Sequence, residues 1–155
     1  QEKRNLSSSK ETSLSGEFQA DTPKPWILEA EQIMDALKND EILLLDVRNE
    51  SRFRGEKEPI DPVAGHIPGA KNEPFQVNLE ENGLWKNAET LRRQYLERFP
   101  DLDQKKCVPY CGSGVTACHT FFALRHAGFD HLSIYPGSWS EWISDASRPV
   151  AVGEE

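Results

Sequence analysis

Apolar residues along the chain fall into short blocks that predict strands and helices in alternation. Residues 42–47 form an apolar run typical of a strand buried on both faces of a parallel sheet. Runs at 106–110 and 132–135 predict two further strands. Apolar residues at helical spacing predict helices around 33–38, 91–99 and 115–127. Because strands that alternate with helices imply right-handed crossovers, we expect an α/β fold with a mainly parallel central sheet flanked by helices.

Residues that break regular structure mark the ends of these elements. Asn39 and Asp40 end the first helix. Pro100 stops the second, and Gly128 ends the third. Pro109 has no N–H to donate, so the strand at 106–110 is expected to pair on one side there or to be irregular. The third helix is predicted to turn four residues inward: Val115, Cys118, Phe122 and Ala123.

The first 24 residues differ in composition from the rest of the chain. They are rich in Ser, Glu and Lys and show neither helical nor strand periodicity. Residues 1–24 are therefore predicted to be a flexible linker or tail. Residues 25–155 are long enough to form one compact domain.

Charge, hydrophobicity and cysteine content argue against a nucleic-acid-binding, membrane or disulfide-rich secreted protein. With 26 acidic and 18 basic residues the net charge is −8, which repels phosphate backbones, so no nucleic-acid partner is expected. No apolar run approaches the ~20 residues that span a bilayer, so we expect no membrane association. Three cysteines do not form a disulfide framework, and the chain starts without the apolar core of a secretory signal. A reducing, cytoplasmic setting is favoured.

Residues 111–117, Cys-Gly-Ser-Gly-Val-Thr-Ala, link a predicted strand directly to a predicted helix. A helix N-terminus presents unpaired N–H groups and partial positive charge, which stabilise a thiolate. Gly112 and Gly114 permit positive φ angles, so successive N–H groups can surround the sulfur of Cys111. We therefore expect the Cys111 thiol to have a lowered pKa and to act as a nucleophile, with a persulfide held by the same donors.

Four motifs in this order resemble the rhodanese family. They are Leu-Asp-Val-Arg at 45–48, Gly-His-Ile-Pro-Gly-Ala at 65–70, the loop at 111–117 and Gly-Ser-Trp-Ser-Glu-Trp at 137–142. The resemblance runs from about Pro25 to the end of the chain. It implies a rhodanese-like domain of the C-terminal catalytic type, in which Cys111 accepts sulfur from a small-molecule donor and passes it to a thiol or cyanide. It implies no cofactor and no metal.

The same resemblance assigns roles to individual residues. Arg52 matches the substrate-binding arginine, whose planar fork suits a carboxylate. Ser113 matches a catalytic serine that relays a proton or polarises the leaving group. The substrate-binding positions of the loop are Gly112, Gly114, Val115 and Thr116.

Two features of the sequence bear on the choice of sulfur donor: the residues of the cysteine loop and one position that differs from the pattern of the family. Thiosulfate sulfurtransferases typically carry basic residues just after the cysteine, whereas Gly112 and Ser113 are neutral, which favours 3-mercaptopyruvate. Some relatives have a second arginine nine residues after the first, where this chain has Asp61. The second carboxylate anchor is therefore absent or comes from elsewhere.

Other reactive side chains are given structural roles. Cys107 and Cys118 are interpreted as small buried apolar residues, and neither the cysteines nor the histidines have the spacing of a zinc site. His66 is expected to hold a turn through backbone hydrogen bonds, and Arg48 to tie neighbouring loops together. His119 either tunes Cys111 or faces solvent. The tryptophans Trp139 and Trp142 are expected to close the end of the domain by packing.

Three function classes follow. The first is a sulfurtransferase that works through a persulfide on Cys111, with a thiol acceptor such as a thioredoxin-like protein. The second is a cysteine phosphatase, which needs an arginine six residues after the cysteine. This chain has Ala117 at that position, so the second class fits poorly. The third is a catalytically incomplete persulfide carrier or interaction module. Mercaptopyruvate sulfurtransferases resemble two rhodanese domains in tandem, and one fits here, so an N-terminal rhodanese domain is an expected partner.

Overall fold

Three parallel strands form the centre of the fold, in the order β2-β1-β3. The computed structural model describes Gly16 and residues 26–154. Strand β1 (Ile42–Asp46) pairs with β2 (Lys71–Asn72) on one side and along its whole length with β3 (Lys106–Tyr110) on the other. Apart from Gly16, the predicted linker at 1–24 lies outside the described residues.

The sheet continues beyond β3 through extended segments. The N–H of Ser133 donates to Cys107 O at 3.0 Å, and the N–H of Tyr135 donates to Pro109 O at 3.2 Å. The predicted strand at 132–135 is thus present only as isolated bridges rather than as a continuous element. Because the N–H and C=O of one strand residue point the same way, the N–H that Pro109 lacks is missing on this outer side, and its pairing with β1 is intact.

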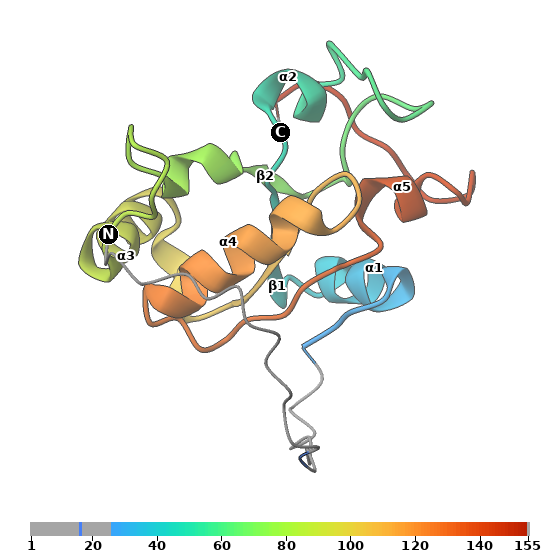
Figure 1. Ribbon diagram of the computed structural model, residues 1–155. Coiled ribbons are helices and arrows are strands. Elements are labelled where there is room, and N and C mark those ends of the chain that lie inside the picture. The colour runs from blue at the N-terminus through green and yellow to red at the C-terminus, as the bar shows by residue number, and fades with distance from the viewer. Residues whose placement is uncertain (1–15, 17–25, 155) are drawn as a thin grey trace.

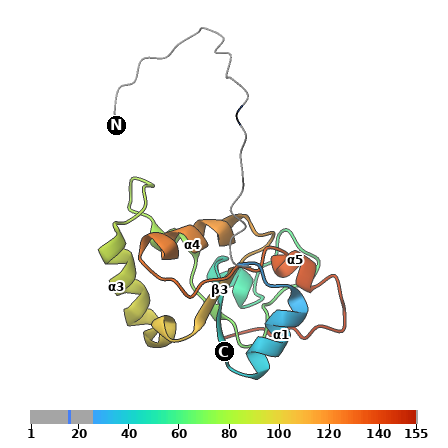
Figure 2. The same cartoon turned by 90° about the horizontal axis from the view of Figure 1, so that it is seen from below.

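Helices cover both faces of the sheet (Figures 1 and 2). One face packs against α3 (Ala88–Arg98) and α4 (Val115–His126), and the other against α1 (Ala30–Lys38) and α5 (Ser138–Trp142). Shorter elements connect these layers: α2 (Glu50–Phe53) and the 3-10 helices η1 (Phe75–Asn78) and η2 (Pro100–Asp103). The α/β class with a parallel sheet flanked by helices is confirmed.

Local sequence signals account for the helix ends. The side chains of Glu29 and Gln32 form a capping box at the start of α1, which ends one residue before Asn39. The Asn87 side chain accepts a hydrogen bond from Thr90 N–H at 2.9 Å and caps α3. Gly128, with φ of 85°, follows the end of α4 as predicted.

The predicted inward face of α4 is wrong at three of its four positions. Val115 is 74% exposed, Phe122 is 57% exposed, and Cys118 is also exposed; Ala123 alone is buried. The residues that face the core are Ala117, Thr120, Phe121, Ala123 and Leu124. Because α4 carries apolar residues on all its sides, helical spacing did not single out the buried face.

Two buried tryptophans close the face of the sheet beneath α5, as predicted. Trp139 and Trp142 are fully buried, and their indole N–H groups donate to Val63 O at 2.9 Å and Pro149 O at 2.8 Å. This packing anchors α5 beside the carboxyl end of β3. Among the described helices, none is both long and apolar enough to cross a membrane.

Candidate active site

Cys111 follows the carboxyl end of β3 directly and stands at the start of the loop that leads into α4. Its backbone is held by the beginning of α5. The Cys111 N–H donates to Ser138 Oγ at 3.1 Å, and the Cys111 carbonyl accepts from Trp139 N–H at 2.9 Å. Ser138 is fully buried and has a positive φ of 56°, and its hydroxyl donates to Tyr135 O at 3.0 Å. The nucleophile candidate is thus fixed between β3 and α5.

Several N–H and O–H groups point at the Cys111 sulfur. Burial opposes ionisation of the thiol, but hydrogen bonds from the Thr116 hydroxyl and from the backbone N–H groups of Ala117, Ser113 and Thr116 outweigh it and lower the Cys111 pKa. The donors come from the first turn of α4 and the loop before it, so the helix N-terminus adds its partial positive charge. The arrangement favours a thiolate, and it can hold any anion attached to this sulfur in the same way.

Only one of the two loop glycines has the left-handed conformation predicted for both. Gly114 has φ of 85°, and a Cβ there would lie 2.6 Å from the carbonyl oxygen of Pro136, so no other residue fits. Gly112 lies outside the positive-φ region, and a Cβ there would meet Arg52 Nη1 at 3.5 Å, an ordinary contact. At Gly112, therefore, neither the backbone angle nor the space beside Arg52 requires a glycine.

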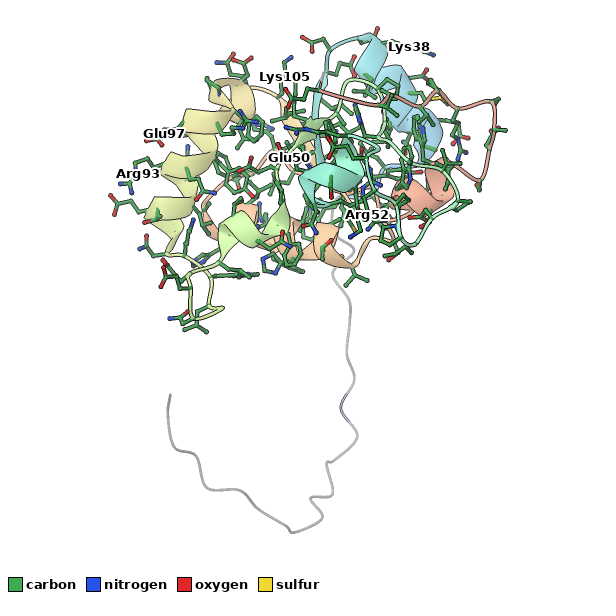
Figure 3. All side chains as sticks on the ribbon, turned by 90° about the horizontal axis from the view of Figure 1, so that it is seen from above. Lys38, Glu50, Arg52, Arg93, Glu97 and Lys105 are labelled. Atoms are coloured by element: carbon green, nitrogen blue, oxygen red, sulfur yellow. The ribbon has the colours of Figure 1, made fainter. Side chains whose placement is uncertain are left out.

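Arg52 lies on α2 (Figure 3). Its guanidinium group reaches the cysteine loop but is held by two carboxylates. Its Nε donates to Glu58 Oε2 at 3.0 Å, and its Nη2 donates to Glu58 Oε1 at 2.7 Å and to Asp61 Oδ2 at 3.1 Å. Burial opposes ionisation of Glu58, but hydrogen bonds from Arg52 and from two backbone N–H groups lower its pKa. These bonds use Nε and Nη2 and leave Nη1 without a partner among the described residues, and both terminal nitrogens lie beside Gly112.

Other predicted positions of the loop lie at its surface. Ser113 and Val115 are exposed, and Thr116 is half-buried with its hydroxyl on the sulfur. Glu58 and Ser138 were not predicted as parts of the site, and Asp61 was interpreted as a missing anchor rather than as a partner of Arg52. Ser138 belongs to the motif at 137–142, in which the tryptophans were interpreted as packing residues and the serines were given no role.

Arg48 and His66 have the structural roles predicted for them. Arg48 donates to both oxygens of Asp46, to Gly65 O at 2.7 Å and to Glu58 at 3.3 Å, and so joins three segments of the chain. His66 Nδ1 lies 2.8 Å from Phe53 O, and its ring stacks on the Phe53 ring at 3.7 Å. The turn at 65–70 is thus tied to α2, the helix that carries Arg52.

The other two cysteines differ from each other. Cys107 is fully buried, as predicted, and burial raises the pKa of its thiol. Cys118 is exposed on α4, which corrects the prediction that it is buried. All three cysteines are free thiols. His119 is half-buried and accepts a hydrogen bond from Trp85 Nε1 at 3.0 Å, and burial lowers its pKa.

The reactive groups of the site are one activated thiol, the N–H groups around it and one arginine that is paired with two carboxylates. Among the described residues, no three His, Cys, Asp or Glu side chains are grouped so that they could hold a metal ion.

A thiol held by a helix N-terminus at the carboxyl edge of a parallel sheet is the arrangement expected for a rhodanese, and residues 29–145 match the family described as "Rhodanese-like domain". The chain belongs to this family. It is 46% identical over 139 residues to a Pseudomonas aeruginosa protein named "Probable 3-mercaptopyruvate sulfurtransferase", covering 90% of this chain and 49% of the relative. It is 35% identical to a thiosulfate sulfurtransferase of Gallus gallus, covering 88% of this chain and 47% of the relative.

A solved structure has the same fold. The Tum1 protein of Saccharomyces cerevisiae superposes with a TM-score of 0.73 at 26% identity, covering 83% of this chain and 47% of that one. The chain therefore spans about half the length of the curated relatives and of this structural neighbour.

Proposed function

We propose that this domain is the catalytic half of a sulfurtransferase that carries sulfur as a persulfide on Cys111. The observation that carries the proposal is the set of hydrogen bonds from Thr116, Ser113 and Ala117 that lower the pKa of the Cys111 thiol. A terminal persulfide sulfur is also an anion. The same donors would therefore stabilise both the nucleophile and the intermediate.

The reaction proceeds in two transfers. The Cys111 thiolate attacks the sulfur of 3-mercaptopyruvate, the carbon–sulfur bond breaks, and its electron pair leaves with the carbon as the enolate of pyruvate. The enolate takes up the proton of the donor's thiol, with exposed Ser113 as the proposed relay. The thiolate of an acceptor then attacks the outer sulfur of the persulfide, and the Cys111 thiolate departs. A small thiol or the thiol of a thioredoxin-like protein would serve as acceptor.

Arg52 is the proposed anchor for the carboxylate of the donor. Since Glu58 and Asp61 occupy Nε and Nη2, the donor carboxylate would bind at Nη1, which lies beside Gly112. This contact is a single charge-assisted bond rather than a two-pronged one, so it orients the donor more weakly than an unpaired arginine would.

The neutral loop favours 3-mercaptopyruvate over thiosulfate. Relatives at comparable coverage are named for each donor, so the choice rests on the site. Thiosulfate is a dianion that needs cations close to the cysteine, and the loop residues Gly112 and Ser113 offer none.

A second rhodanese domain is proposed to complete the site. The chain spans about half the length of its relatives, and Val115, the first residue of α4, is 74% exposed directly beside the cysteine loop. Such an apolar residue at the mouth of the site suits contact with another domain. Without that domain we expect sulfur capture to persist but turnover to be slow, because groups that orient the donor and exclude water are absent.

The test is pyruvate release from 3-mercaptopyruvate with a thiol acceptor present. Three proteins are compared: this chain, its Cys111→Ser variant, and this chain joined to a preceding rhodanese domain from a full-length relative. We expect no release by Cys111→Ser and faster release by the joined protein than by the single domain. Release by Cys111→Ser at the wild-type rate would overturn the proposed nucleophile, and equal rates for the single and joined proteins would overturn the half-enzyme proposal.

A further inference from the structure

Asp61 contacts Arg52 directly and is linked to the cysteine loop through Ser140. Its Oδ2 accepts from Arg52 Nη2 at 3.1 Å, and its Oδ1 lies 2.8 Å from the hydroxyl of Ser140. That hydroxyl lies 2.8 Å from the carbonyl oxygen of Gly112, which also accepts the Ser140 N–H at 2.9 Å. One carboxylate thus links the anchor arginine to the residue that follows Cys111.

Around Arg52 the site carries more negative than positive charge, which disfavours the binding of anions. Two guanidinium groups, Arg48 and Arg52, face three carboxylates. Arg48 is paired with Asp46 and shares Glu58 with Arg52, so Asp61 is the third negative charge against two positive ones. The Asp61 side chain is 8% exposed and that of Arg52 is 15% exposed, so water screens this pair less than it screens a surface pair.

We propose that Asp61 is a specificity-determining residue, whose charge lowers the affinity of the site for anions and disfavours doubly charged sulfur donors. The inference deepens the proposed function, on which its substrate statement rests. Asp61 neutralises part of the positive charge of Arg52. The site consequently discriminates against thiosulfate, which carries one more negative charge than the carboxylate of 3-mercaptopyruvate.

The first experiment measures the charge effect without a sulfur donor. Cys111 is alkylated with iodoacetate, an anion, and with iodoacetamide, its neutral analogue, and the rates at Cys111 and Cys118 are followed separately by fragment-ion mass spectrometry. Asp61→Asn keeps an oxygen for Ser140 but removes the charge. We expect its iodoacetate-to-iodoacetamide rate ratio to rise about tenfold, the effect of one unit charge acting over ~10 Å at an effective dielectric of about 20.

Two controls separate charge from loop geometry. Ser140→Ala removes the hydroxyl between Asp61 and Gly112 without changing any charge, so both alkylation rates change together and their ratio stays constant. Exposed Cys118 on the same molecule is the internal reference, and its ratio stays constant in every variant. Asp61→Ser is a second neutral variant, used with Asp61→Asn after thermal unfolding has shown which of them is folded.

The second experiment compares the specificity constants for the two donors. In Asp61→Asn the ratio of kcat/KM for thiosulfate to that for 3-mercaptopyruvate is expected to rise about tenfold, mainly through KM, because one negative charge has been removed. Ser140→Ala should leave this ratio unchanged.

The outcomes distinguish this inference from the proposed function. An unchanged alkylation ratio in both folded neutral variants would overturn the role of Asp61. A raised alkylation ratio in a protein that takes sulfur from neither donor would uphold anion exclusion by Asp61 and overturn the sulfurtransferase proposal. A raised alkylation ratio with an unchanged donor ratio would overturn the claim that Asp61 selects the donor.

Discussion

Removing the Thr116 hydroxyl is expected to raise the pKa of the Cys111 thiol by about one unit. Thr116→Val keeps the shape of the side chain and deletes the hydrogen bond from its hydroxyl to the sulfur, which contributes more to the lowered pKa than any single backbone bond. A hydrogen bond to a charged group is worth about 1.5–3 kcal/mol, and one pKa unit corresponds to ~1.4 kcal/mol. Sulfur is a weak acceptor, so we take the lower end of this range.

The assay is the rate of Cys111 alkylation by iodoacetamide as a function of pH. Only the thiolate reacts, so the rate rises with pH and reaches half its maximum at the pKa. The wild-type midpoint should lie below that of an ordinary cysteine, and the Thr116→Val midpoint should lie about one unit higher. At a pH below both midpoints the variant should react about tenfold more slowly, because its thiolate fraction is smaller by that factor.

The matched control is Thr116→Ser, which keeps the hydroxyl and should keep the wild-type midpoint. A midpoint for Thr116→Val within about 0.2 units of the wild type would refute the reasoning, since the backbone N–H groups alone would then set the pKa. A high wild-type midpoint, like that of an unperturbed cysteine, would refute the assignment of the whole set of donors.

Three further predictions concern stability and selectivity. Gly114→Ala should lower the free energy of unfolding by at least ~2 kcal/mol in a urea titration, because its Cβ would collide with a backbone carbonyl at positive φ. Gly112→Ala, the control, should lower it by less than about 0.5 kcal/mol. Equal losses in the two variants would contradict this distinction. Arg48→Met should lower the free energy of unfolding by about 3–5 kcal/mol, since buried Asp46 loses its charged partner and Glu58 keeps only Arg52, and a loss below ~1 kcal/mol would contradict the importance of this network. Ser113→Lys should raise the ratio of kcat/KM for thiosulfate to that for 3-mercaptopyruvate by placing a cation at the exposed mouth of the loop; an unchanged ratio would show that loop charge does not select the donor.

Much of the fold could be predicted because local signals and burial agree in this chain. The apolar run at 42–47 became β1, and the residues that break helices at 39–40, 100 and 128 lie where α1, α3 and α4 end. The inward face of α4 could not be predicted, since Val115 and Phe122 are as apolar as the buried Phe121. The segment at 132–135 has the composition of a strand, yet it forms isolated bridges instead of a continuous ladder.

The site was predictable as far as it is local in sequence. Cys111, Gly114 and Thr116 lie on one short loop and helix turn, so their relation follows from the geometry of a helix N-terminus. The surroundings of Arg52 were not predictable, because they depend on how the loop after α2 folds back. Glu58 and Asp61 meet the guanidinium only through that loop, and no periodic pattern marks it.

The most direct test of the central claim is mass spectrometry of Cys111 after the protein has been incubated with 3-mercaptopyruvate and freed of excess donor. Fragment-ion spectra report which cysteine has gained sulfur, with fully buried Cys107 and exposed Cys118 as references in the same sample. We expect one additional sulfur atom on Cys111, lost on addition of a thiol acceptor, and none on the other two cysteines. Sulfur on Cys118 instead, or no sulfur on Cys111 with either 3-mercaptopyruvate or thiosulfate, would contradict it.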